Sequence, residues 1–258
     1  MAPPFAKLTL QQFVERLSGF SFSRRVGAVH MHHTWRPNHA NFKKAADKHS
    51  IIVSMWRFHT DPPPKGRGFS DIAQHITIDP QGNVWLGRDW NLPPASATGH
   101  NGSKALGPFM FEMIGDFDRE KDPFVDPQKN CALTVVAAVQ KRFGLPVESL
   151  RFHNQMASKT CPGSSIAYQK TLEEVRSVAA KLDAAGPVWW TAIVPFSGTI
   201  HAAAEVQPAA FASMPSAGLE DGELPEEKTA RRKAAKRVGK KRKSSAERKG
   251  RRTRRKKS

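Results

Sequence analysis

The sequence predicts an α/β fold in which a single mixed central β-sheet is flanked by helices. Short runs of β-branched and apolar residues alternate along the chain with longer segments whose apolar residues recur at helical spacing. Proline and glycine mark the turns between these segments. Strands and helices that alternate in this way are typical of layered folds built on one sheet.

Each expected element rests on a local pattern. The strands are expected at residues 26–32, 72–79, 84–90, 109–115 and 149–153. The helices are expected at residues 50–60, 130–143 and 171–186. Pro80-Gln81-Gly82-Asn83 predicts a hairpin, Ser50 is the expected cap of its helix, and Gly144 and Gly186 are stop signals for theirs.

Composition divides the chain into four parts. A leading helix within residues 1–23 is expected to pack on the main domain, which spans 24–186. Residues 187–227 are rich in Ala and Pro and are interpreted as a linker, followed by a Lys/Arg-rich tail over 228–258. The linker contains a short apolar segment at 188–194, and a bilayer span needs about 20 residues. A packed edge strand is therefore expected there, with a contact patch or an interfacial anchor as alternatives.

Three residues have the chemistry of a zinc site. His153 and Cys161 lie on one short loop, and His32 ends a predicted strand far upstream, where a loop can open onto a cleft. Zinc prefers nitrogen and sulfur donors, and a catalytic zinc keeps one coordination position open. Two histidines and one cysteine leave that position free, so these three residues are the candidate ligands.

Ordinary structural roles compete with this interpretation. The chain has ten histidines, and a single histidine is more often a core or surface residue than a ligand. His33 can point away from the metal, and His30, on the same strand face as His32, is a rival ligand. Cys131 lies in a helical pattern, where the role of a small buried apolar residue is expected.

The motifs follow one another in an order that resembles a known family. His32-His33-Thr34 is followed by the segment 71–79, by Gly99-His100-Asn101, and by the segment 153–163. This order resembles zinc N-acetylmuramoyl-L-alanine amidases of the second type. That family includes phage lysozyme-like amidases, anhydro-muropeptide amidases and peptidoglycan recognition proteins. The resemblance covers residues 24–168.

The resemblance implies a cofactor, a reaction and a fold. It implies that Zn2+ is held by His32, His153 and Cys161 and that Lys159 is catalytic. The implied reaction is hydrolysis of the amide between N-acetylmuramic acid and L-alanine in peptidoglycan or muropeptides. A lysine ammonium also has the charge needed to hold an oxyanion. The implied fold is the mixed sheet flanked by helices that the local patterns predict.

The general base is where the chain departs from part of the family. Phage-type members carry a tyrosine where this chain has Gln74, and an amide does not shuttle protons near neutral pH. The anhydro-muropeptide amidases also lack the tyrosine and carry a glutamate on the strand that corresponds to Glu112. We therefore expect Glu112 to be the base. A salt bridge to Arg88 or Arg151 is the structural alternative, and an inactive fold is the functional one.

Four residues are expected to bind substrate: Trp35, Gln74, His100 and Asn101. Aromatic faces pack on sugar rings, and polar groups read the peptide. Trp85 and Trp90 are weaker candidates, because both belong to the predicted hairpin and core packing explains them equally well.

The tail has a different character from the rest of the chain. Residues 228–258 hold 18 Lys or Arg and one acidic residue, Glu247, and so carry +17 of the formal +18. Such a segment is expected to be disordered in isolation and to bind polyanions, either nucleic acid or an anionic envelope polymer. A polyanion-binding protein dominated by this tail and a catalytically inactive peptidoglycan-binding protein are therefore the alternatives to a cell-wall lytic amidase.

The expected place of synthesis rests on the patterns that direct a protein to or across a membrane. No N-terminal segment has the apolar core of a signal peptide, and no stretch is long and apolar enough to span a bilayer. We expect synthesis in the cytoplasm, with which two cysteines and no disulfide framework agree. The expected site of action is the bacterial cell wall after release or injection, and the expected state is a monomer.

Overall fold

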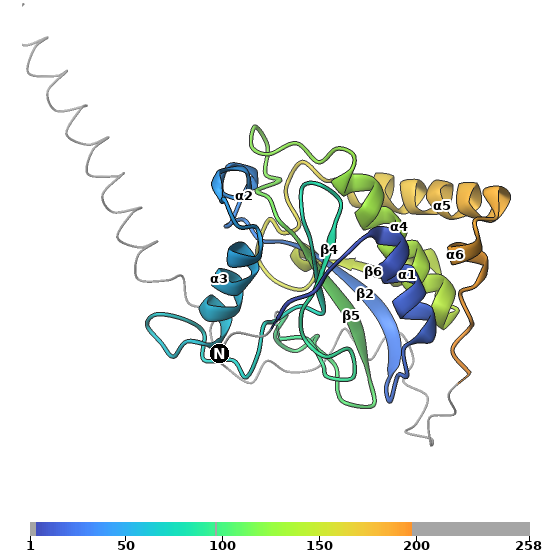
Figure 1. Ribbon diagram of the computed structural model, residues 1–258, viewed down its shortest axis with the longest axis horizontal. Coiled ribbons are helices and arrows are strands. Elements are labelled where there is room, and N and C mark those ends of the chain that lie inside the picture. Colours follow the sequence, from blue (N-terminus) through green and yellow to red (C-terminus); the bar gives the residue numbers. More distant parts are fainter. Residues whose placement is uncertain (1–3, 96, 198–258) are drawn as a thin grey trace, which may run out of the picture. The chain divides into compact units, whose positions relative to one another are not determined.

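One mixed sheet organises the part of the chain that the computed structural model describes, residues 4–95 and 97–197. In these residues the sheet has six strands in the order β1-β4-β3-β5-β2-β6 (Figure 1). The strands are β1 Lys7–Leu8, β2 Arg25–His33, β3 Ile76–Ile78, β4 Val84–Leu86, β5 Leu106–Met113 and β6 Leu150–Phe152. β3, β5, β2 and β6 pair in parallel, and β4 is antiparallel to both β1 and β3. The predicted fold class is confirmed.

The helices divide into two groups. The α-helices are α1 Leu10–Gly19, α2 His39–Lys44, α3 His49–Thr60, α4 Gln128–Phe143, α5 Tyr168–Ala185 and α6 Val188–Thr191, and the 3-10 turns are η1 Val147–Ser149 and η2 His153–Gln155. Figure 1 shows α1, α4, α5 and α6 together on one side of the sheet, with α2 and α3 apart from them. Helix α4 packs against β2, β3 and β5, and both α1 and α5 pack against α4.

The face of the sheet under α4 is apolar, because side chains alternate between the two faces of a strand. Val29 and Met31 of β2 and Phe109 and Phe111 of β5 are fully buried in one core with the α4 side chains. Burial of side chains of this size contributes about 1.5–3 kcal/mol each. The apolar face therefore fixes how β2 and β5 are oriented.

The opposite face carries a polar row. His30 and His32 are two residues apart on β2 and so share this face. Their register partners on β5 are Met110 and Glu112, and Thr77 of β3 pairs with Glu112. The parallel register therefore sets His32, Glu112 and Thr77 side by side on three neighbouring strands.

The elements expected from the sequence are present, with small changes. β3 and β4 form the predicted hairpin but are shorter than expected. Gly144 and Gly186 end α4 and α5 in the left-handed conformation, with φ 62° and 57°. The predicted cap of α3 is wrong: the helix begins before Ser50, whose hydroxyl donates to the Asp47 carbonyl oxygen (2.6 Å). The short strand β1 and helix α2 were not expected.

Residues 188–191 of the apolar segment 188–194 form helix α6, so the packed edge strand expected there is wrong. Helix α6 buries Trp190, which is 1% exposed. The chain continues along the domain to Phe196, whose backbone N–H donates to the Arg142 carbonyl oxygen (2.7 Å). Residues as far as Phe196 therefore contact the domain.

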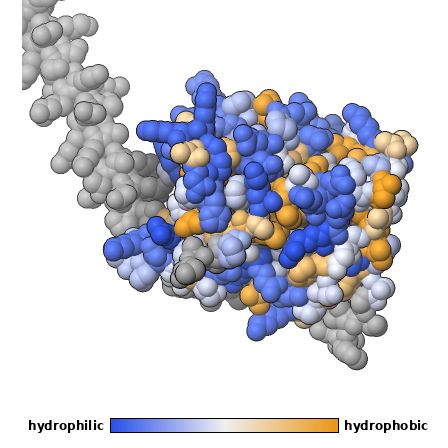
Figure 2. Space-filling model, viewed as in Figure 1, coloured by the Kyte–Doolittle hydropathy of each residue, from blue (hydrophilic) through white to orange (hydrophobic). Residues whose placement is uncertain are grey.

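The remaining organisation lies outside the described residues. The linker from residue 198 onward and the tail over 228–258 both belong to that part of the chain. Among the helices that the structure describes, none has the length and apolar character needed to cross a membrane. On the face shown in Figure 2, hydrophilic residues are interspersed with smaller apolar patches.

His75 ties β5 to the loop that follows β4. Its Nδ1 accepts from the Met110 backbone N–H (3.0 Å), and its Nε2–H donates to the Leu92 carbonyl oxygen (2.9 Å). The bond from Met110 requires a neutral ring, because a protonated Nδ1 cannot accept, whereas Nε2–H can donate to Leu92 in either state. Burial lowers the pKa of His75 to about 3, and the hydrogen bond to Leu92 offsets only part of that shift.

We expect His75 to make the metal-free protein less stable in acid. The unfolded chain protonates this ring near pH 6.5 and the folded chain only near pH 3, so the free energy of unfolding falls as the pH drops through this window. Between pH 7 and pH 4.5, protonation of this ring in the unfolded chain should lower the free energy of unfolding by about 2–3 kcal/mol. Urea unfolding with a chelator present measures it. His75→Phe should narrow the difference between the two pH values, and an unchanged difference would contradict the assignment.

Candidate metal centre

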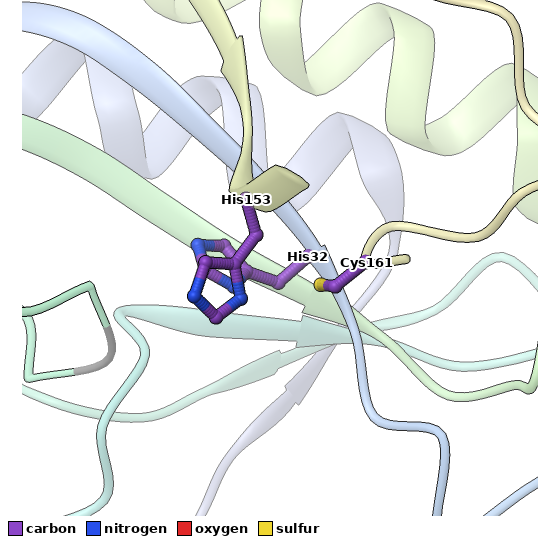
Figure 3. A group of neighbouring side chains, drawn as sticks. All are labelled: His32, His153 and Cys161. Carbon is purple, nitrogen blue, oxygen red and sulfur yellow. The ribbon is translucent and has the colours of Figure 1, made fainter. Parts of the chain in front are cut away.

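Three buried side chains from distant parts of the chain meet at the end of β2. His32 lies on β2, His153 begins η2 directly after β6, and Cys161 lies on the loop before α5 (Figure 3). One ligand atom from each side chain lies within 4.8 Å of the other two. The ring centroids of His32 and His153 are 4.4 Å apart. The structure thus brings together the three residues that the sequence suggested as ligands.

The surroundings of this group fit a zinc ion. His32 is 2% exposed, and His153 and Cys161 are each 6% exposed. The buried Nε2 of His32 has no hydrogen-bond partner among the described residues, which is costly unless a ligand takes the place of water. Two imidazole nitrogens and one sulfur are also the donor set of a catalytic zinc with one open position.

Burial acts in opposite directions on the two kinds of ligand. Desolvation lowers the pKa of His32 well below its ordinary value, so the ring is neutral and able to coordinate. Desolvation raises the pKa of the Cys161 thiol, and the hydrogen bond from the His33 backbone N–H to Sγ (3.3 Å) opposes this shift. A bound divalent cation stabilises the thiolate form, because the ligand sulfur must be deprotonated.

Glu112 lies beside this group as the register partner of His32. Among the described residues its carboxylate forms no ion pair, and no hydrogen bond or neighbouring charge shifts its pKa. The salt bridge to Arg88 or Arg151 is therefore not formed: both guanidinium groups donate to backbone carbonyls instead. The side chain keeps some contact with solvent, yet desolvation raises the pKa of Glu112 to about 8.

Lys159 and Trp35 are both exposed. The Lys159 charge is close enough to lower the pKa of both His32 and Cys161. Trp35 is 45% exposed and has φ 55°, a conformation that bulky residues rarely adopt. The Arg36 guanidinium lies 5.7 Å from the indole centroid. The Trp35 ring is thus presented at the surface close in sequence to His32.

Gln74 is fully buried, and only one of its two side-chain polar atoms has a hydrogen-bond partner among the described residues. Its Nε2 donates to the Thr77 hydroxyl (2.9 Å), while its Oε1 has no hydrogen-bond partner among the residues described. Thr77 is the register partner of Glu112, so this amide lies near the polar row. A tyrosine hydroxyl is absent from this position, as the sequence indicates.

The remaining candidates for substrate binding have other surroundings. His100 is half-buried and lies near His30, whose pKa is lowered to about 3 by desolvation and to a smaller extent by His100. Asn101 accepts through Oδ1 from the Ala97 backbone N–H (3.0 Å), which closes its own turn. Trp85 and Trp90, which are 5% and 3% exposed, are core residues.

The two rival histidines have other positions. His30 shares the face of His32, with ring centroids 6.4 Å apart, but is not part of the group of three. His33 projects to the opposite side, where its Nδ1 accepts from the Phe117 backbone N–H (3.2 Å).

The sequence did not point to the segment 116–119, which contacts the loop carrying Cys161. Asp118 accepts a hydrogen bond from Thr160, 42 residues away. No spacing pattern links residues at such a distance. The position of this segment directly after the strand of Glu112 was the one signal that could have drawn attention to it.

Sequence comparison with known proteins finds relatives among amidases and peptidoglycan-recognition proteins. The family model described as N-acetylmuramoyl-L-alanine amidase matches residues 22–164. The human N-acetylmuramoyl-L-alanine amidase is 27% identical over 148 residues, which are 55% of this chain and 23% of that protein. Peptidoglycan-recognition protein SC2 of Drosophila melanogaster is 27% identical over 137 residues, which are 53% of this chain and 67% of that protein. The chain therefore spans less than a quarter of the length of the human relative.

Solved structures give similar matches. The amidase LysC from Clostridium intestinale has a TM-score of 0.44 at 22% identity and covers 60% of this chain and 89% of its own. The peptidoglycan recognition protein PGRP-SA of Drosophila has a TM-score of 0.45 at 22% identity and covers 57% of this chain and 78% of its own.

We expect the purified protein to bind one zinc ion through Cys161. Cys161→Ala should weaken zinc binding by more than about 100-fold. Loss of a residue that only hydrogen-bonds to a metal ligand already lowers metal affinity by about 10–100-fold, and loss of the ligand itself should lower it further. Competition with a chromophoric chelator measures the affinity. Cys131→Ala is the matched control, since Cys131 is also buried but lies in helix α4. Equal zinc affinity in the two variants would contradict the assignment of Cys161.

Proposed function

The chain belongs to the N-acetylmuramoyl-L-alanine amidase family, and on that premise we propose that it is a zinc-dependent hydrolase of peptidoglycan. The bond cleaved is the amide that joins N-acetylmuramic acid to L-alanine. The observation that carries the proposal is the convergence of His32, His153 and Cys161 beside Glu112, a carboxylate that has no partner among the described residues. The chain has the residues for hydrolysis and not only for binding.

The three ligands would hold the zinc ion. In such a donor set, zinc supplies Lewis-acid chemistry: it polarises a carbonyl and makes water acidic enough to ionise near neutral pH. His32 contributes a neutral imidazole, because burial keeps its pKa low. The Cys161 sulfur is held by the His33 backbone N–H, which limits its movement.

Glu112 is proposed as the general base. A base must lie within reach of the water that it deprotonates, and Glu112 pairs in register with the ligand His32. No described cation engages its carboxyl group, and desolvation raises its pKa to about 8. The charge of a bound zinc ion would lower this pKa, and the ionised carboxylate would then accept a proton and pass it to the leaving amine. Gln74 cannot take this role, because an amide neither gains nor loses a proton near neutral pH.

Lys159 and Gln74 are proposed to hold the substrate. The exposed Lys159 ammonium acts electrostatically on both His32 and Cys161, which supports a role for its charge in holding the scissile carbonyl of a bound substrate. The buried Oε1 of Gln74 is an acceptor in need of a donor, and a substrate N–H group would supply one. Trp35, His100 and Asn101 are proposed to contact the bound substrate.

We expect Glu112→Gln to lower kcat on purified sacculi by about 10²–10⁴-fold, the range for loss of a general base. Zinc affinity should stay close to that of the unaltered protein, since Glu112 is not a ligand. Glu148→Gln is the matched control, because Glu148 lies at the surface in an ion pair with Arg176. The assay is mass identification of the released peptides, which should begin with L-alanine.

Two outcomes would overturn parts of this proposal. Full activity in Glu112→Gln would remove Glu112 from the mechanism. Binding of sacculi without release of any peptide, by a zinc-loaded protein, would make the chain a peptidoglycan-binding module and not an enzyme.

A second proposed function belongs to the tail. Residues 228–258 carry a net +17 and contain no aromatic residue, so stacking on bases is not available to them. Binding through phosphate groups alone is electrostatic and independent of sequence. The shared chemistry of nucleic acids and of phosphate-rich envelope polymers is what this segment would recognise.

We expect the full chain to bind duplex DNA and purified teichoic acid with strong salt dependence. Affinity for DNA should fall by about 10³-fold or more between 50 and 200 mM salt. Deletion of residues 228–258 should abolish binding to both polymers and leave the release of peptides from small muropeptides unchanged. Binding that survives the deletion would place the polyanion site elsewhere.

A further inference from the structure

The loop that carries Cys161 is closed by a carboxylate from another part of the chain. Asp118 accepts through Oδ1 from the Ser164 backbone N–H (2.9 Å) and through Oδ2 from the Thr160 hydroxyl (3.1 Å). Thr160 directly precedes Cys161 and Ser164 follows it by three residues. The two oxygens of one side chain therefore bracket the turn that presents the sulfur.

The backbone around Asp118 adds to this bracket. The Phe117 carbonyl oxygen accepts from both the backbone N–H (3.1 Å) and the hydroxyl (2.6 Å) of Ser165. The Arg119 backbone N–H donates to the Ser164 hydroxyl (3.1 Å). A Cβ at Gly163, which has φ 132°, would lie 2.3 Å from the Phe117 oxygen, so only glycine allows this approach.

The same segment reaches the sulfur from its other side. The Phe117 backbone N–H donates to His33 Nδ1 (3.2 Å), and the His33 backbone N–H donates to Cys161 Sγ (3.3 Å). A continuous set of contacts thus runs from the Asp118 segment through His33 to the sulfur and back along the loop. Residues 116–119 and His33 hold Cys161 between them.

The need for such a device follows from where Cys161 sits. His32 and His153 are fixed by strand β2 and by the end of β6, whereas Cys161 lies on a loop whose residues Lys159 and Thr160 are exposed. Loops move more than the elements they connect. A metal site requires its ligands to be held to within about 0.5 Å.

Asp118 is suited to this task in its charged form. Desolvation raises the pKa of its carboxyl, but the hydrogen bonds from Ser164 and Thr160 outweigh it, and the pKa is lowered overall. An ionised carboxylate offers both oxygens as acceptors, which is what the two donors require.

We propose that Asp118 is a positioning residue for the metal ligand Cys161, and that it sets zinc affinity by holding the loop 160–165 closed. This rests on the proposed zinc site. Asp118 does not touch the ligand sulfur itself, so its effect passes through the loop.

The test compares Asp118→Ala, Asp118→Asn and the surface control Asp183→Ala in the full chain. Zinc affinity is measured by competition with a chromophoric chelator. The thiolate-to-cobalt charge-transfer absorption of the protein saturated with Co2+ reports the sulfur ligand directly. Thermal unfolding with a chelator present shows that each variant is folded.

Asp118→Ala should weaken zinc binding by about 10–100-fold, as for other partners of metal ligands, and reduce the charge-transfer absorption. Asp118→Asn should recover most of the affinity, because its amide oxygen can accept from Ser164 and its amide nitrogen can donate to Thr160. Asp183→Ala should behave like the unaltered protein.

Unaltered zinc affinity and absorption in Asp118→Ala would overturn the positioning role and leave the zinc site intact. An Asp118→Asn protein as weak as Asp118→Ala would overturn the role of these two hydrogen bonds. If the unaltered protein bound no zinc, the proposed function would fail, and the role of Asp118 with it.

Discussion

The parallel register between β2 and β5 is the constraint on which the rest of the site depends. It pairs His32 with Glu112 and places both on the face away from α4. Because side chains alternate along a strand, a slip of one residue would turn these groups into the core and bring Met31 and Phe111 to the site. Burial of the apolar face under α4 therefore fixes the register of β2 and β5. The same register sets the positions of His32 and Glu112 on the polar face.

Parallel pairing also explains why ligands so far apart in the chain meet. The carboxyl ends of parallel strands lie at one edge of the sheet, and β2 and β6 are neighbours there. His32 lies near the end of β2, and His153 follows β6 directly. Two of the three ligands are thus delivered by the sheet itself. The third, Cys161, comes from a loop and depends on contacts with the segment 116–119 for its position.

Patterns local in the sequence predicted much of this structure. Helical periodicity and turn residues located α4, α5 and the β3–β4 hairpin, since those signals arise from neighbouring residues. Motif spacing identified the three residues that the structure brings together. What local patterns missed depends on distant partners. The side chain of Asp118 finds its donors 42 and 46 residues away, and residues 188–191 form helix α6 because Trp190 is buried against the domain.

X-ray absorption at the zinc edge of the purified protein tests the central claim most directly. The arrangement of His32, His153 and Cys161 predicts one sulfur at about 2.3 Å and two imidazole nitrogens at about 2.0–2.1 Å from the metal. Loss of the sulfur signal in Cys161→Ala, and its retention in Cys131→Ala, would tie that signal to the loop. A first shell without sulfur in the unaltered protein would contradict the site, since Cys161 would then not be a ligand.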